Sequence, residues 1–119
     1  MPYLKVQTNL KNNKDSYAEY TKKISQYLSE ELNKPKEKIM LAIEYVPDML
    51  FAKSTDYIAY IECKSVALTD DQIRLLAKGL CQLMEKEMNI SKDRIYIEFT
   101  DISRSMWGFK GATLEIPKI

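Results

Sequence analysis

Histidine is absent from the 119 residues, and cysteine and glycine are scarce, with two and three copies. Without histidine the chain cannot build a serine–histidine–aspartate triad or a histidine-ligated metal site. The two cysteines, Cys63 and Cys81, are too few and too widely separated for a thiolate metal cluster, and both lie in apolar patterns typical of small buried side chains. We therefore expect neither a metal nor a cofactor.

A strong charge of one sign and a long apolar run are also missing. The net charge is +1, which gives no electrostatic basis for binding nucleic acid or an anionic membrane. No apolar run approaches the roughly 20 residues of a membrane-spanning helix. The N-terminus lacks the basic and apolar segments of a signal peptide. We expect a cytoplasmic protein.

The length suits a single domain, here taken as 1–119, that can bury its own core. Residues 3–8 alternate in the manner of a strand, and the strongly apolar 39–46 predicts a second strand. Between them, 15–33 predicts a helix with Asp15 or Ser16 as its N-cap. Its apolar side chains recur every three or four residues. They are Tyr17, Tyr20, Ile24, Tyr27, Leu28 and Leu32.

The second half repeats this order of elements. Residues 57–66 predict a strand, Thr69 and the two following aspartates open a helix, and 94–100 predict the last strand. The halves align at an offset of 56, which places Leu80 on Ile24 and Met84 on Leu28. The second helical face has the side chains Ile73, Leu76, Leu80, Leu83, Met84 and Met88. The repeats run from about 1 to 50 and from 57 to 105.

Two βαβ units of this kind predict an α+β (α/β) fold, a four-stranded mixed sheet with both helices on one face. The strands at 39–46 and 95–99 look apolar on both sides, so the second sheet face needs a cover. Other subunits in a closed ring supply that cover most simply. The tail, 106–119, predicts a turn and a short strand that pairs with a neighbour's sheet edge.

Pro2 directly follows the initiator Met1. Methionine aminopeptidases remove a first methionine that precedes a small residue such as proline, and removal leaves a free secondary amine. An α-amino group has a reference pKa of about 7.7–8.0. Burial or a nearby cation lowers that pKa because both disfavour the charged form. Pro2 is therefore a candidate general base.

Several short motifs follow one another along the chain. They are Met1-Pro2, Thr8-Asn9, Lys34-Pro35 with Ile39, Val46-Pro47-Asp48, Lys64-Ser65-Val66, Arg94-Ile95-Tyr96-Ile97, Asp101, and Trp107-Gly108-Phe109 with Thr113. In order and spacing they resemble those of the macrophage migration inhibitory factor family of the tautomerase superfamily. The match is nearly gapless apart from the extra residues Glu115 to Ile119.

This resemblance implies a homotrimer whose three sheets line a central barrel, with the helices outside. It implies an active site around Pro2 at each subunit interface. It further implies keto–enol tautomerisation of phenylpyruvate-like or dopachrome-like compounds, with a small aromatic α-keto acid as substrate. Non-classical secretion is also implied for a chain without a signal peptide.

The resemblance carries roles over to particular residues. After Met1 removal, Pro2 would act as general base, and Lys34 would hold the substrate carboxylate and lower the Pro2 pKa. The backbone at Ser65 and Val66 would contact the substrate, with Val66 where isoleucine is common. Tyr96 would enter the neighbouring subunit's site, or else be an ordinary core tyrosine.

The aromatic tail and the lysine run need separate interpretation. Met106, Trp107 and Phe109 would form an aromatic rim beside the substrate, although a core position for Trp107 fits equally well. A charge run is usually a solvated turn, so we interpret Lys36 and Lys38 as solvent-facing.

Two departures from the family pattern qualify these roles. Glu98 stands where many relatives have asparagine, and its carboxylate would repel an anionic substrate unless a cation such as Lys34 pairs with it. Some animal relatives have a Cys-x-x-Cys where this chain has Ile58 to Ile61, so no thiol–disulfide activity is expected.

Two alternatives to the tautomerase remain open. One is a cytokine-like signalling protein in which receptor binding matters and turnover is weak or vestigial. The other is a different reaction at the N-terminal proline, decarboxylation or hydration, for which Glu98 would supply an additional charged group.

Overall fold

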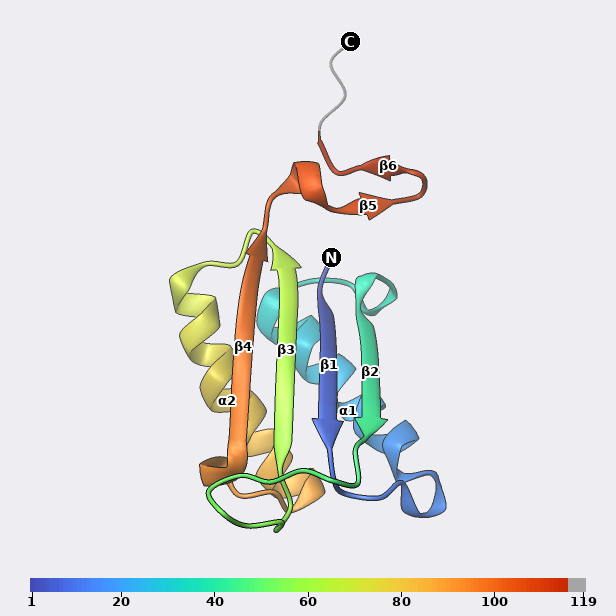
Figure 1. Ribbon diagram of the computed structural model, residues 1–119. Coiled ribbons are helices and arrows are strands. Elements are labelled where there is room, and N and C mark those ends of the chain that lie inside the picture. Colours follow the sequence, from blue (N-terminus) through green and yellow to red (C-terminus); the bar gives the residue numbers. More distant parts are fainter. Residues whose placement is uncertain (116–119) are drawn as a thin grey trace.

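The computed structural model describes residues 1–115. Its sheet has the order β2-β1-β3-β4, with β1 parallel to β2, β3 parallel to β4, and β1 antiparallel to β3 (Figure 1). The elements are β1 (Tyr3–Thr8), α1 (Ser16–Leu32), β2 (Met40–Tyr45), β3 (Ala59–Val66), α2 (Asp70–Met88), β4 (Ile95–Ile102), β5 (Gly108–Phe109) and β6 (Ala112–Thr113).

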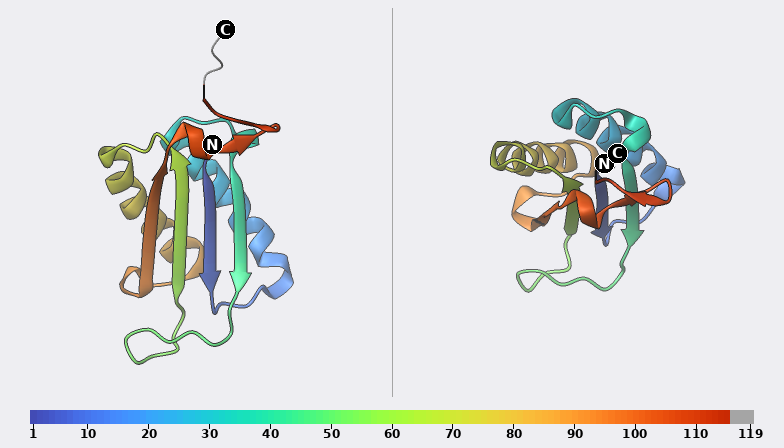
Figure 2. Two further views of the ribbon diagram at one scale, coloured as in Figure 1. Left: turned by 45° about the horizontal axis from the view of Figure 1, so that its top comes forward. Right: turned by 90° about the horizontal axis from the view of Figure 1, so that it is seen from above.

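Both helices cover the same face of the sheet, as the view from above in Figure 2 shows. The predicted mixed sheet with two helices on one face is confirmed. The core between the layers contains Leu4, Ile61, Leu28 and Leu80, all fully buried. Cys63 is also buried, as predicted, and burial raises the pKa of its thiol to about 11. Cys81 is only half-buried.

The opposite sheet face is mostly polar, so the expectation that the strands at 39–46 and 95–99 are apolar on both sides is wrong for β4 and holds only in part for β2, which turns Met40 and Ala42 to this face beside Glu44. Alternation along each strand turns Leu41 and Ile43 of β2 toward the core and leaves Glu44 exposed. Lys5 of β1 lies 3.3 Å from the Glu44 carboxylate. In the same way, β4 exposes Tyr96 and Glu98. Further side chains on this face are Tyr3, Gln7, Tyr60, Glu62 and Lys64.

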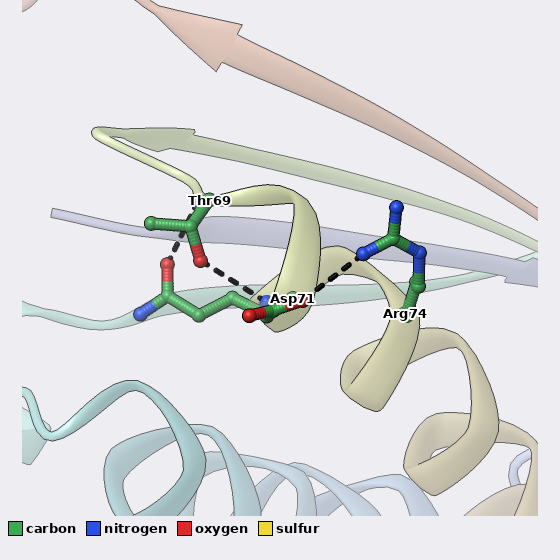
Figure 3. A network of polar contacts seen from close by, with 4 residues as sticks. Thr69, Asp71 and Arg74 are labelled. Atoms are coloured by element: carbon green, nitrogen blue, oxygen red, sulfur yellow. Dashed lines mark hydrogen bonds and ion pairs between the residues drawn. The ribbon is translucent and has the colours of Figure 1, made fainter.

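The two helices begin differently. Asp15, one of the two predicted caps, is the N-cap residue of α1, but its backbone is left-handed with φ 59° and its side chain makes no capping bond. Asn12 accepts the bond from the Tyr17 amide instead, at 2.9 Å. At α2 the Thr69 hydroxyl accepts from the Gln72 amide, and the Gln72 side chain accepts from the Thr69 amide (Figure 3).

The connection between the repeats is held by side chains from both halves. Arg94 donates hydrogen bonds to four carbonyls of this loop. The acceptors are Phe51, Ser54, Asp56 and Tyr57. Asn9 accepts from the Ile58 amide at 2.8 Å and donates to two further loop carbonyls. Anchoring of this loop thus explains why Asn9 and Arg94 belong to the sequence motifs.

The tail folds over the end of the sheet at which the chain begins (Figures 1 and 2). Strands β5 and β6 pair with each other as a hairpin, where a single short strand was predicted. Arg104 and Leu114 close its base, with Nε donating to the Leu114 carbonyl and the Leu114 amide donating back, both at 3.1 Å. Pairing of the tail with a neighbour remains a prediction, and residues 116–119 lie outside the described part.

Neither α1 nor α2, the two α-helices of residues 1–115, is long and apolar enough to span a membrane.

Replacing Arg94 with methionine should lower the free energy of unfolding by about 2 kcal/mol, since four loop carbonyls, two of them in half-buried residues, lose a charged donor. The matched control is Arg74→Met, which removes only the exposed pair with Asp71 (Figure 3) and should cost less than about 0.5 kcal/mol. Urea denaturation at equal protein concentration measures both. Equal effects of the two substitutions would contradict the anchoring role.

Candidate functional site

The antiparallel pairing of β1 with β3 determines where the chain begins. Tyr3 lies opposite Lys64 of β3 and opposite Met40 of β2. The Pro2 carbonyl accepts a hydrogen bond from the Met40 amide at 3.0 Å, which fixes the first residues beside the sheet. Pro2 itself is less than 2% exposed, with Met1 ahead of it. The N-terminus is thus built into the fold.

Two recesses meet at Met1. One, of about 260 Å³, is lined by Met1, Lys34, Pro35, Lys38, Val66, Ala67, Arg104 and Leu114. The other, of about 280 Å³, is lined by Met1, Pro2, Tyr3, Glu37, Lys38, Ile39, Met40, Trp107, Gly108 and Phe109. A larger depression of about 740 Å³ beside α1 is lined by neither Met1 nor Pro2, so it contains no terminal amine. Met1 and Lys38 are common to the two N-terminal recesses.

Three cations surround the terminal amine. Burial lowers the pKa of the Met1 amine below its ordinary 8.0, and the charges of Lys34, Lys38 and Arg104 lower it further. The Lys38 ammonium lies 4.4 Å from the centre of the Phe109 ring, within cation–π distance. The site therefore combines an amine that loses its proton readily with an aromatic wall and positive charge.

The interpretation of Lys38 as solvent-facing is wrong, whereas Lys36 is exposed as predicted. The 3₁₀ turn Lys36–Lys38 accounts for the difference, because a single turn directs its first and last side chains differently. A run of lysines carries no sign of which one turns inward. Arg104 was not singled out from the sequence, although it lies between the motif residues Asp101 and Trp107.

The segment after β3 forms a wall of the first recess. Val66 is 5% exposed and is followed by Ala67 in the left-handed region, with φ 63°. Asp101 of β4 accepts a hydrogen bond from the Leu68 amide at 3.0 Å and so holds this turn. Ser65 is buried and lies one residue before the wall, so its predicted contact with a ligand stays a prediction.

Tyr96 and Glu98 lie away from the N-terminus of their own chain. Tyr96 pairs with Tyr60, and Tyr60 pairs with Gln7. Gln7 is five residues along β1 from Pro2, on the order of 17 Å. Tyr96 is 64% exposed and its ring centre lies 4.7 Å from that of Phe51. Glu98 accepts a hydrogen bond from Tyr60 at 3.0 Å, so the anticipated pairing with Lys34 does not form within the protomer.

Among residues 1–115 no three carboxylate or thiol side chains lie close enough together to bind a metal ion. The chemistry of the described site rests on the amine, the cations and the apolar walls.

Known proteins share this chain's sequence pattern and fold. The model of the macrophage migration inhibitory factor (MIF) family matches residues 1–115. The chain belongs to this family. It is 33% identical over 114 residues to a MIF homolog of Brugia malayi, covering 95% of this chain and 98% of the relative. It is 34% identical over 93 residues to MIF of Xenopus tropicalis, covering 76% and 79%.

Solved structures of the family have the same fold. A MIF homologue from Prochlorococcus marinus superimposes with a TM-score of 0.86 at 29% identity, covering 95% of this chain and 99% of that one. MIF from Trichinella spiralis gives a TM-score of 0.85 at 22% identity, covering 93% and 98%, which bears on the fold alone. The family resemblance and the tautomerase fold are confirmed.

Neutralising Lys38 should raise the pKa of the Met1 amine, because the protonated amine then escapes repulsion. With one cation fewer nearby, the protonated amine is repelled less and is more stable, so its pKa rises. The pH dependence of N-terminal acetylation measures the pKa of the Met1 amine in Lys38→Gln and Lys34→Gln. Mass spectrometry first confirms that each protein carries Met1. Lys36→Gln is the control and should leave the curve in place. Identical curves for Lys38→Gln and the parent chain would refute the assignment.

Proposed function

We propose that this protein, after removal of Met1, is a keto–enol tautomerase with the Pro2 amine as general base. Its substrates are small aromatic α-keto acids such as phenylpyruvate, and dopachrome-like compounds. One observation supports this above the others: the buried Pro2 directly follows Met1, at which two recesses meet, and three cations surround the Met1 amine. Loss of Met1 would join the recesses around the new amine.

The reaction moves one proton between carbon and oxygen. In the keto-to-enol direction, the neutral Pro2 amine takes a proton from the carbon beside the carbonyl, and the electron pair moves to the carbonyl oxygen. A proton then reaches that oxygen, and the amine gives up the proton it gained. Lys34 holds the carboxylate next to the carbonyl and favours the neutral amine. Phe109 and Val66 provide apolar walls on either side.

The complete site, in this proposal, belongs to a homotrimer whose sheets line a central barrel. Tyr96 of each protomer would reach the neighbour's Pro2, with Glu98 beside it on the same strand. Two observations support this: the Tyr96 ring is exposed and packs against Phe51, and Tyr96 lies far from the N-terminus of its own chain. The outer strands β2 and β4 also have one edge each without a partner in the four-stranded sheet.

Pro2→Gly should lower kcat/KM for phenylpyruvate tautomerisation by at least about 100-fold, the usual contribution of a positioned general base. Glycine still permits Met1 removal, so intact mass must confirm that both proteins begin at residue 2. A parent chain that keeps Met1 should be similarly inactive, because its proline nitrogen is then an amide without basicity. Undiminished activity in Pro2→Gly would exclude the mechanism.

Mixed trimers test whether the site is shared. Subunits with Pro2→Gly and subunits with Tyr96→Ala should each have low activity alone. After unfolding and refolding together in equal amounts, roughly a quarter of the sites would combine an intact proline with a neighbour's intact tyrosine in a closed ring. Tautomerase assays before and after mixing measure the regain. No regain, with trimers confirmed by light scattering, would place Tyr96 outside the shared site.

A signalling role is the second candidate, favoured by the names of the relatives, which describe inhibition of macrophage migration. Such a role would depend on surface contacts and not on the amine. The Pro2→Gly protein separates the two: a signalling protein would keep its activity on macrophages after tautomerase activity is lost.

A further inference from the structure

The recess beside Met1 contains more positive charge than one carboxylate requires. Lys34, Lys38 and Arg104 all line it. Among residues 1–115 none of the three has a carboxylate within ion-pair distance, since the pairs formed there are Lys5–Glu44, Lys23–Glu87 and Arg74–Asp71. Gathering three cations without a counterion is unfavourable, and an anionic ligand would relieve it.

Two of these cations are held in place by contacts that leave them able to bind a ligand. Arg104 uses Nε for the Leu114 carbonyl, which orients the guanidinium and leaves its terminal nitrogens for a bidentate contact. The Lys38 ammonium rests 4.4 Å from the Phe109 ring centre, at the boundary between the two recesses. An ammonium over a ring still has donors directed away from it.

The nearby carboxylates do not cancel this charge. Glu37 lines only the second recess, and its side chain is exposed. Glu98 of the same chain bonds to Tyr60 at a distance from the N-terminus, and a neighbour's Glu98, which the proposed trimer would bring to this site, would offset only one of the three charges. The remaining walls of the first recess are apolar, from Val66 and Leu114. The recess therefore suits a ligand with an apolar body and an additional negative charge.

We propose that the substrate of this site is a keto acid with a second anionic group, a dicarboxylate whose first carboxylate binds Lys34 and whose second lies between Lys38 and Arg104. This inference rests on the proposed function and specifies its substrate class. The reaction is unchanged, a proton transfer through the Pro2 amine. The second carboxylate adds binding energy and orientation without taking part in the chemistry.

The test compares acids that differ by one carboxylate. Phenylacetate and 4-carboxyphenylacetate do not react, and isothermal titration to the processed protein gives their affinities. Phenylpyruvate and 4-carboxyphenylpyruvate give the matching kcat/KM values. The dianion should be favoured by at least about tenfold in both comparisons, and the preference should weaken as salt increases.

Single substitutions show which side chains cause the preference for the dianion. Lys38→Gln and Arg104→Gln should each reduce the preference for the dianion several-fold, because each weakens binding of 4-carboxyphenylacetate more than binding of phenylacetate, while Lys36→Gln should leave the preference intact. Arg104→Gln also removes a tail hydrogen bond, so circular dichroism checks its fold, and Lys38→Gln tests the idea without disturbing that bond. Equal binding of the two acids by the parent protein, or a preference that survives both substitutions, would overturn the proposal.

The two arms separate this proposal from the function on which it rests. Turnover of phenylpyruvate without any dianion preference would refute the substrate class and keep the tautomerase. Preferential binding of 4-carboxyphenylacetate without turnover of either keto acid would refute the tautomerase and keep a dianion site.

Discussion

The antiparallel pairing of β1 with β3 is the constraint on which the rest of the molecule depends. It joins the two repeats into one sheet and sets the start of β1 against the end of β3. Within each repeat the strands are parallel, so each helix must cross over, and both cross on the same face. The N-terminus consequently meets the turn after Val66 and the turn before β2 at one end of the sheet.

The chemistry of that end comes from groups that are weak separately. An α-amine is a poor base at neutral pH while it is protonated, and a lysine in water is only a solvated charge. Burial of the Met1 amine and the gathering of Lys34, Lys38 and Arg104 change both, because burial and positive charge favour the neutral amine and the three cations form no ion pair with a carboxylate of residues 1–115. Base strength and attraction for anions thus arise from one arrangement.

Much of the fold could be predicted because its signals are periodic and repeated. The offset of 56 residues aligned the buried faces, and Ile24, Leu28, Leu80 and Met84 are all in the core. The errors occurred where periodicity is silent. The left-handed backbone at Asp15 leaves the capping hydrogen bond of α1 to the Asn12 side chain, and one turn of 3₁₀ helix directs Lys38 inward.

The sequence by itself determined the two βαβ units, the family, and Pro2 as the candidate base, since hydrophobic spacing and motif order are local properties of the chain. Only the tertiary structure decided which cations reach the amine, because Lys38 and Arg104 come from segments 66 residues apart that meet when the tail folds over the sheet. It likewise placed Tyr96 and Glu98 far from their own Pro2, since strand register, not sequence spacing, sets distances across a sheet.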